Sequence, residues 1–339
     1  MSKLTDAQLG AVADLLTAQG AVVHGDLSAR LIEGGRSNLT YLLEDEESRW
    51  VLRRPPTAGA TPSAHDVARE FRVTSALEGA GVPVPPSVLL CQDDAVLGAP
   101  FTVVAFVEGS SLRTRADVDA LDESLLKSSL DELVATLAAL HSVDHEAVGL
   151  STFGRPDGYA ARQLRRWSGQ WEIVGTDDSG RAEALADRLR GAVPDQPHTA
   201  VVHGDYRSDN TLVDLGDGGR VKAIVDWELS TIGDPVADVA LMCAYRHPAL
   251  DMILGFPSAW TSSRLPDVAD LASAYERAGG VRLDHWEFHQ ALAFYKLAVI
   301  AAGIDHRYRA GGTVGDGFET AGDAVAELID AGLNILETT

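Results

Sequence analysis

Residues 201–228 constrain this chain more than any other stretch, because short apolar runs and polar residues alternate there in a fixed order. An apolar run ends at Val202 and is followed by His203, Gly204 and Asp205, and a polar loop continues to Asn210. A further apolar run ends at Val225, directly before Asp226. Mg²⁺-dependent phosphoryl transfer needs a carboxylate that orients the attacking hydroxyl and accepts its proton, and hard oxygen ligands for the metal. The pattern therefore predicts Asp205 as catalytic base, and Asn210 and Asp226 as Mg²⁺ ligands.

The same residues carry a family resemblance. Residues 203–210 read HGDYRSDN and residues 224–226 read IVD, which resembles the catalytic segment of the aminoglycoside phosphotransferase and choline kinase family. Residues 226–238 read DWELSTIGDPVAD, which is similar to the phosphotransferase domain fused to some acyl-CoA dehydrogenases and to its free-standing bacterial relatives. The resemblance covers essentially the whole chain and is sharp from 201 to 240.

The resemblance implies an α+β, bilobal, protein-kinase-like fold. Residues 1–107 are expected to form a smaller, sheet-bearing nucleotide lobe, and residues 108–339 a larger, mainly helical lobe with the base and the acceptor site. Leucines at helical spacing from 125 to 141 support helix in the second part. Only eleven residues separate Asp226 from Asp238, which leaves no room for a segment that docks a peptide and favours a small-molecule acceptor.

A glycine turn between two predicted strands lies upstream of the catalytic stretch. Such a turn lets backbone N–H groups approach phosphates closely, although most turns of this kind are structural. Its candidate nucleotide contacts are Gly34, Gly35, Ser37 and Asn38.

The next strand ends in Arg53 and Arg54, where the family usually carries a lysine that contacts the nucleotide phosphates. Arg53 is the matching position, and Arg is a planar fork where Lys is a point charge. The resemblance pairs this residue with Glu70 on the following helix. It also places a hinge that binds adenine through its backbone at Val104, Ala105, Phe106 and Val107.

Other predicted roles are supporting. His203 and Asp238 are expected to hold the catalytic loop, His203 as a structural residue more than a proton shuttle. Candidate acceptor contacts are Arg207, Glu228, Tyr295 and Lys296. Glu228 is interpreted either as an assistant at the metal or as an anchor of its turn.

Composition excludes some partners. The formal net charge of −22 argues against nucleic acid and anionic membranes. The two cysteines, Cys91 and Cys243, lack the spacing of a metal site and indicate a reducing, cytoplasmic setting. The N-terminus shows no charged-then-apolar signal pattern, and the apolar run from 291 to 304 is too short to cross a bilayer.

The sequence thus predicts an ATP- and Mg²⁺-dependent transfer of the γ-phosphoryl group to a hydroxyl of a small molecule. The likeness to the dehydrogenase-fused domains implies a hydroxyacyl-CoA or similar anionic acceptor. An aminoglycoside acceptor is the first alternative. A catalytically silent nucleotide-binding scaffold is the alternative from another class, with Arg53 in place of Lys as the feature in its favour, and a protein kinase is a weaker one.

Overall fold

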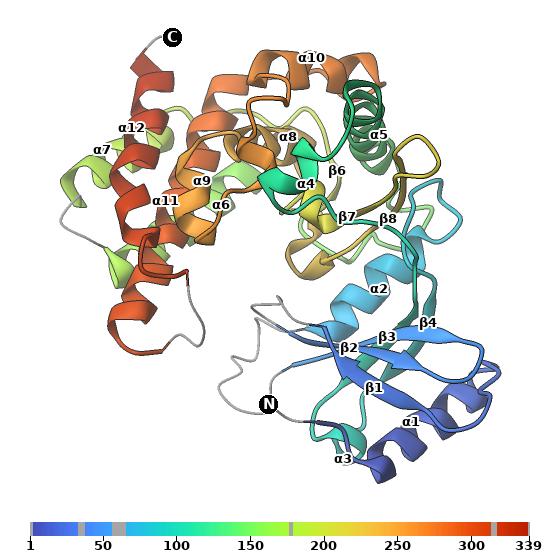
Figure 1. The fold of residues 1–339 in the computed structure, drawn as a ribbon. Helices are drawn as coiled ribbons and strands as arrows, with labels where there is room; N and C mark the ends of the chain where they lie inside the picture. The colour runs from blue at the N-terminus through green and yellow to red at the C-terminus, as the bar shows by residue number, and fades with distance from the viewer. Residues whose placement is uncertain (1–2, 33–37, 56–65, 176–178, 313–316, 338–339) are drawn as a thin grey trace. The chain divides into compact units, whose positions relative to one another are not determined.

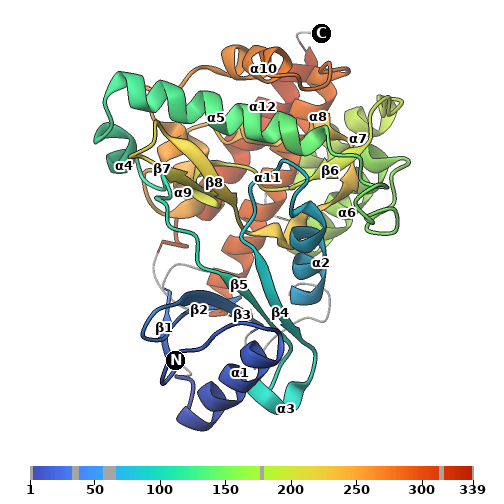
Figure 2. The ribbon, with the colours of Figure 1, turned by 90° about the vertical axis from the view of Figure 1, so that its right-hand side faces the viewer.

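A five-stranded antiparallel sheet forms the centre of the N-terminal part of the computed structural model, which describes residues 3–32, 38–55, 66–175, 179–312 and 317–337. The strands lie in the order β1-β2-β3-β5-β4 (Figures 1 and 2). They are β1 (Ser28–Leu31), β2 (Leu39–Glu44), β3 (Arg49–Arg54), β4 (Ser87–Cys91) and β5 (Phe101–Ala105). In β3 the side chains alternate between the two faces of the sheet, so Arg53 and Arg54 leave the strand on opposite sides.

Among the described residues, three helices accompany this sheet: α1 (Asp6–Ala18), α2 (Val67–Leu77) and α3 (Asp94–Leu97). Figure 2 shows α1 and α3 beside the sheet, and a core of buried apolar residues joins α1 to the strands, with Leu16, Leu43 and Leu52 inaccessible to solvent. The side chains of Thr5 and Gln8 form a capping box at the start of α1. Burial of this apolar face therefore fixes α1 on the sheet.

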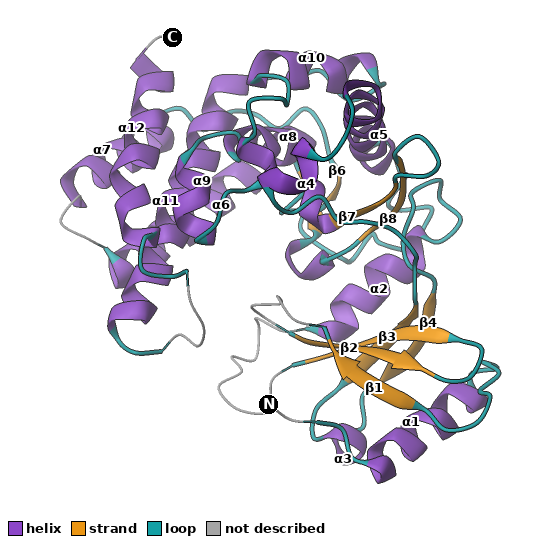
Figure 3. Cartoon of the chain, in the orientation of Figure 1, coloured by secondary structure: helices purple, strands orange, loops and turns teal. Residues whose placement is uncertain are grey.

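The rest of the chain is mainly helical, with short strands between the helices (Figure 3). Its longer helices are α5 (Glu123–His141), α6 (Tyr159–Val174), α7 (Ser179–Gly191), α8 (Pro235–Ala244), α10 (Val268–Arg277), α11 (Trp286–Arg309) and α12 (Ala324–Glu337). Its shorter elements are α4 (Arg115–Asp119), β6 (Ala200–Val202), η1 (Ser208–Asn210), β7 (Thr211–Asp214), β9 (Thr231–Gly233), α9 (Ala249–Leu254), η3 (Ala259–Thr261) and η4 (Ala321–Asp323).

The chain divides into two compact units. The first comprises residues 1–109 together with 222–230, and the second comprises residues 110–221 together with 231–339. Strand β8 (Arg220–Ile224) crosses the division, and η2 (Trp227–Leu229) belongs to the first unit. The return of 222–230 to the first unit was not predicted from the sequence. It rests on tertiary contacts, such as the hydrogen bond from the Ile224 N–H to the Pro83 carbonyl at 2.9 Å.

Helices α11 and α12 end the second unit. Helix α11 is buried along most of its length, in agreement with its nearly continuous apolar character. The last helix, α12, begins at Ala324 after the turn η4. No described helix is both long and apolar enough to cross a membrane.

Candidate active site

The loop that follows β6 carries the predicted base. Strand β6 pairs with β9 in antiparallel register, and the chain then turns at Gly204, whose φ of +83° is a left-handed conformation that favours glycine. The Asp205 N–H donates to Nδ1 of the inaccessible His203 ring at 3.2 Å. The His203 ring therefore contacts the backbone of the loop, and its role as a structural support of the loop stays a prediction. Its part in turnover stays a prediction.

Asp238, on α8, holds the backbone of the same loop. One of its carboxylate oxygens accepts from the His203 N–H at 2.5 Å, and the other accepts from the Gly204 N–H at 2.7 Å. His141 adds a third contact to Asp238, with Nε2 3.3 Å from Oδ2. Burial by itself raises the pKa of Asp238, but the bond to His141 and the nearby imidazoles outweigh it, and the pKa lies below the usual 3.8. The anion is thus the form that fixes the loop.

His141, near the C-terminal end of α5, links two other polar side chains in the interior. Its Nδ1 lies 2.7 Å from the Tyr275 hydroxyl, so the ring links α5 to α10 as well as to Asp238. The side chains of His141 and Asp238 are almost fully buried. A buried polar chain of this kind is stable because each member has a partner.

The Asp205 carboxylate is held from several sides within the second unit. Its Oδ2 accepts from the Asn210 side-chain amide at 3.0 Å, and its Oδ1 accepts from the Tyr245 hydroxyl. Arg207 Nε lies 3.4 Å from the same Oδ1, while Arg207 Nη1 lies 3.0 Å from Asp209. The predicted base and the predicted metal ligand Asn210 are therefore brought together, and Arg207 is an immediate neighbour of the base.

Sequence reasoning missed Tyr245, the C-cap residue of α8. The signal that could have found it is its spacing: it follows Asp238 by seven residues, which is two helical turns and places both on one face. One helix face thus contacts the loop backbone through Asp238 and the base through Tyr245.

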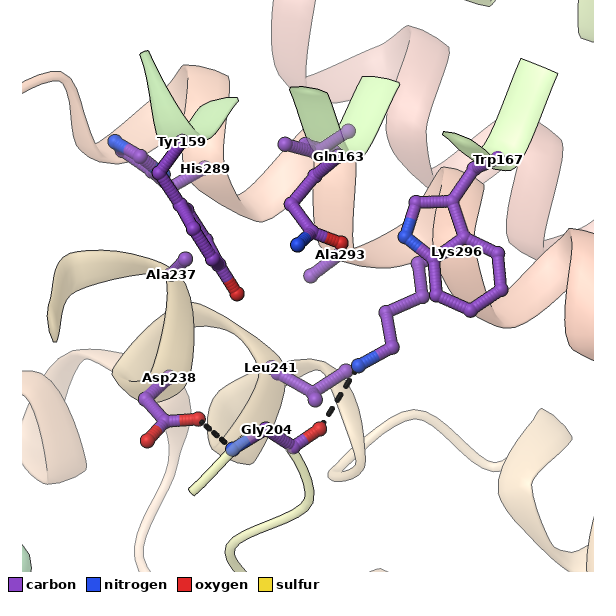
Figure 4. A pocket seen from close by; sticks show the side chains of 11 residues that line it. Tyr159, Gln163, Trp167, Gly204, Ala237, Asp238, Leu241, His289, Ala293 and Lys296 are labelled. Carbon is purple, nitrogen blue, oxygen red and sulfur yellow. Dashed lines mark hydrogen bonds between the residues drawn. The ribbon is translucent and has the colours of Figure 1, made fainter. Parts of the chain in front are cut away.

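A small recess lies beside the catalytic loop, bounded by α6, α8 and α11 (Figure 4). Its cavity of about 30 Å³ is the size of a water molecule. Lys296 reaches across it and donates to the Gly204 carbonyl at 2.8 Å, with its ammonium 5.6 Å from the centre of the Trp167 ring. Burial lowers the pKa of Lys296 below 10.5, although the charges of Asp205 and Asp238 oppose this shift. Lys296 therefore contacts the loop backbone next to the base.

Tyr295, the other predicted acceptor contact on α11, faces elsewhere. Its hydroxyl lies 3.5 Å from the Ser168 hydroxyl, and it lines a separate groove of about 610 Å³ together with Glu172, Glu183 and Asp187. Adjacent residues of a helix point about 100° apart, so Tyr295 and Lys296 line different hollows.

In the first unit, Arg53 is the centre of an ion-pair chain. Its Nη1 lies 3.1 Å from Glu70 Oε2, and its Nη2 lies 2.9 Å from Asp226 Oδ1. The Asn38 amide donates to the other Glu70 oxygen at 3.0 Å. Burial raises the pKa of Glu70 to about 7, against the opposing pull of Arg53. Arg54 turns to the other face and donates to the Leu97 carbonyl at 2.6 Å.

Asp226 has an unusual backbone, with φ +66° and ψ +59°. An aspartate in the left-handed region is uncommon and marks a place where surrounding structure dictates the conformation. The turn η2 that follows is tied back by Trp227, whose indole N–H donates to the Ile224 carbonyl at 2.9 Å. Glu228 lies in this turn, and its charge raises the pKa values of both Glu70 and Arg53.

The predicted hinge continues strand β5. The N–H of Ala105 donates to the Pro86 carbonyl at 2.8 Å, and the N–H of Phe106 donates to the Arg49 carbonyl at 3.1 Å. Val104 pairs with Val51 inside the sheet. An adenine ring bound at residues 104–107 would therefore use backbone groups other than the N–H groups of Ala105 and Phe106. The candidates Gly34, Gly35 and Ser37 lie outside the described residues.

The described residues include no group of three or more His, Cys, Asp or Glu side chains arranged as a metal site. The donor set proposed from the sequence has a different composition, since it combines an amide oxygen with a carboxylate. The side-chain nitrogen of Asn210 donates to both the carbonyl and the carboxylate of Asp205, which leaves the amide oxygen on the opposite side of the group. An amide oxygen and a carboxylate fit Mg²⁺, a hard cation.

The fold and this loop define a kinase-like small-molecule phosphotransferase, and comparison with known proteins places the chain more narrowly. Residues 28–292 match the model of the Phosphotransferase enzyme family, and the chain belongs to that family. A solved protein from Ralstonia eutropha, named as a candidate aminoglycoside phosphotransferase, is 30% identical with a TM-score of 0.83, covering 97% of this chain and 98% of its own. The predicted family and kinase-like fold are confirmed.

The chain is also similar to part of a longer curated protein and to a more distant solved structure. Mouse acyl-CoA dehydrogenase family member 10 is 35% identical over 84% of this chain, which spans 27% of the length of that protein. An aminoglycoside phosphotransferase solved with AMP-PNP and hygromycin B is 16% identical with a TM-score of 0.61, covering 97% of this chain and 98% of its own, and shows likeness of fold alone. The predicted likeness to dehydrogenase-fused domains is thus confirmed.

Proposed function

We propose that this chain transfers the γ-phosphoryl group of ATP to a hydroxyl of a small molecule, with Mg²⁺ and with Asp205 as base. The observation that carries the proposal is the position of the Asp205 carboxylate. The side chains of Asn210 and Tyr245 donate hydrogen bonds to it, and Asp238 accepts from the backbone of the same loop. Positioning and charge neutralisation account for most of the catalysis of phosphoryl transfer. A carboxylate held in this way is suited to orient a hydroxyl.

In the proposed reaction Asp205 takes the proton of the acceptor hydroxyl as the acceptor oxygen bonds to the γ-phosphorus. The bond between that phosphorus and the β–γ bridging oxygen breaks, and ADP leaves with the bridging oxygen. Arg207, 3.4 Å from Asp205, brings a positive charge to the place where the phosphoryl group passes.

Asn210 and Asp226 would hold Mg²⁺, which supplies neutralisation of the phosphate charge. In the first unit, Arg53 would contact the nucleotide phosphates while Glu70 holds its guanidinium. Nucleotide contacts by Asn38, by Gly34, Gly35 and Ser37, and by the backbone of 104–107 complete the proposed ATP site. The neighbour solved with AMP-PNP supports ATP as the donor.

For the acceptor we propose an anionic hydroxy compound such as a hydroxyacyl-CoA. The likeness to acyl-CoA dehydrogenase family member 10 supports this class, and so do the cations Lys296 and Arg207 close to Asp205. An aminoglycoside is the alternative, favoured by the groove in which Glu172, Glu183 and Asp187 gather and by the name of the Ralstonia protein.

The test is ADP release from Mg·ATP with two acceptor panels, aminoglycosides in one and hydroxyacyl-CoAs with simple hydroxy compounds in the other. Asp205→Asn is the blank, and it should lose turnover by about a thousandfold or more while still binding Mg·ATP in calorimetry. Release above the blank with one panel identifies the charge class of the acceptor. Equal release by the wild type and Asp205→Asn contradicts the assigned base, and Mg·ATP binding without release on any acceptor, water included, favours the silent scaffold.

A further inference from the structure

The Asp205 carboxylate has a fixed orientation, and Tyr245 is the residue that links it to α8. A carboxylate offers about four lone-pair positions. Among the described residues, Tyr245 and Arg207 face Oδ1, and Asn210 bonds Oδ2. One position on Oδ2 is therefore left for the proton of an acceptor hydroxyl.

We propose that Tyr245 is a positioning residue that selects this orientation of Asp205 during phosphoryl transfer. The inference rests on the proposed function, because it gives the hydroxyl of Tyr245 a part in that reaction. The bond lies entirely within the second unit, between the catalytic loop and the C-terminal end of α8.

The surroundings of Tyr245 make its hydroxyl a permanent donor. The residue is 6% exposed, and burial, followed by the charge of Asp205, raises the pKa of its phenol well above 10. The phenol therefore stays protonated at neutral pH and donates to the carboxylate. A hydrogen bond to an ionised acceptor is stronger than one between neutral groups.

A second contact fixes the ring itself. The guanidinium of Arg207 lies 5.3 Å from the centre of the Tyr245 ring, within the range of a cation–π contact, and also faces Asp205 and Asp209. Because Asp238 on the same helix holds the loop backbone, α8 sets both the main chain and the side chain of the base. A small rotation of the carboxylate would move the vacant position on Oδ2 away from the acceptor.

The test removes one oxygen atom. Tyr245→Phe keeps the ring and its contact with Arg207 and deletes the hydroxyl. ADP release from Mg·ATP, with water as acceptor or with the best compound of the two panels, should show kcat reduced on the order of tenfold to a hundredfold. The KM for Mg·ATP should stay within about threefold of the wild type, because the nucleotide contacts proposed above do not include Tyr245.

Thr320→Val is the control within the same unit. The Thr320 hydroxyl lies outside the catalytic loop and donates to the Met252 carbonyl at 2.8 Å instead of to Asp205. This variant also loses one hydroxyl donor and should keep kcat within about twofold of the wild type. Equal losses of kcat in the two variants, or an unchanged kcat in Tyr245→Phe, overturn the positioning role.

A stability measurement tests the contact independently of activity. Urea unfolding of Tyr245→Phe, Asp205→Asn and the double variant forms a double-mutant cycle, and non-additive free energies are expected because the two groups share one bond. Additive values overturn the proposed contact. If the wild type releases no ADP with any acceptor while the unfolding free energies are non-additive, the proposed function is wrong. The hydrogen bond between Tyr245 and Asp205 then exists without a catalytic role.

Discussion

The Arg53 guanidinium lies 3.1 Å from the Glu70 carboxylate, and this pair joins strand β3 to helix α2. Only 8% of the Glu70 side chain is exposed, so the carboxylate depends on Arg53 and Asn38 for its partners. Arginine can serve two carboxylates at once, and here the second is Asp226. The arginine at the position where the family usually has a lysine thus contacts two carboxylates of the first unit.

Removing the Arg53 side chain should destabilise the protein. Arg53→Ala leaves Glu70 buried without its cation, and we expect the free energy of unfolding to fall by about 2–3 kcal/mol at pH 8.5 in urea titrations. Arg53→Lys should recover part of this loss, because one ammonium replaces a two-pronged group. Arg49→Ala is the control on the same strand, since its exposed pair with Glu108 should contribute no more than about 0.5 kcal/mol. Equal effects of the two alanine variants would contradict the prediction.

The raised pKa of Glu70 makes a pH-dependent contribution to stability. Its folded pKa of about 7 lies above the ordinary glutamate value of 4.5, so the contribution is fully present below 4.5 and is lost as the pH rises through 7. The loss amounts to at most about 3 kcal/mol. Unfolding free energies measured at pH 4.5 and 8 should fall more steeply for the wild type than for Glu70→Gln. Parallel slopes in the two proteins would rule out this ionisation.

Asp238→Asn should weaken the catalytic loop. The two oxygens of Asp238 accept from different backbone N–H groups, and an amide replaces one of these acceptors with a donor. We expect a loss of about 3 kcal/mol in unfolding free energy at neutral pH and a reduced kcat for ADP release. Because the pKa of Asp238 lies below 3.8, the stabilisation is present above that pH and is lost only in acid. Asp122→Asn, at an exposed N-cap, is the control and should leave kcat unchanged.

Lys296→Met should lower turnover while nucleotide binding is kept. Methionine preserves much of the volume against Trp167 but leaves the Gly204 carbonyl without the Lys296 ammonium, which donates at 2.8 Å. We expect kcat for ADP release to fall about tenfold, with Mg·ATP affinity by calorimetry unchanged. The control is Lys127→Met, which removes an exposed helical ion pair. A kcat equal to that of the control would show that the Lys296 bond does not support the loop during turnover.

Much of this protein could be predicted from the sequence because local order carries the information. The loop and strand pattern of residues 201–240 indicated the family and the kinase-like fold, and the spacing of Asp205 and Asn210 already places both side chains on one short loop. The capping box at Thr5 reflects the local spacing of Thr5 and Gln8, and the burial of α11 reflects its nearly continuous apolar sequence.

Tertiary structure alone decided which distant side chains meet. Arg53 and Arg54 are adjacent in sequence, and only the sheet and helix α2 determine that Arg53 faces Glu70 while Arg54 faces Leu97. Tyr245 reaches Asp205 across forty residues because the packing of α8 against the catalytic loop brings them together. Sequence thus determined the chemistry that is present, and packing determined the partners of each group, because contacts between remote segments form only when their elements bury a common surface.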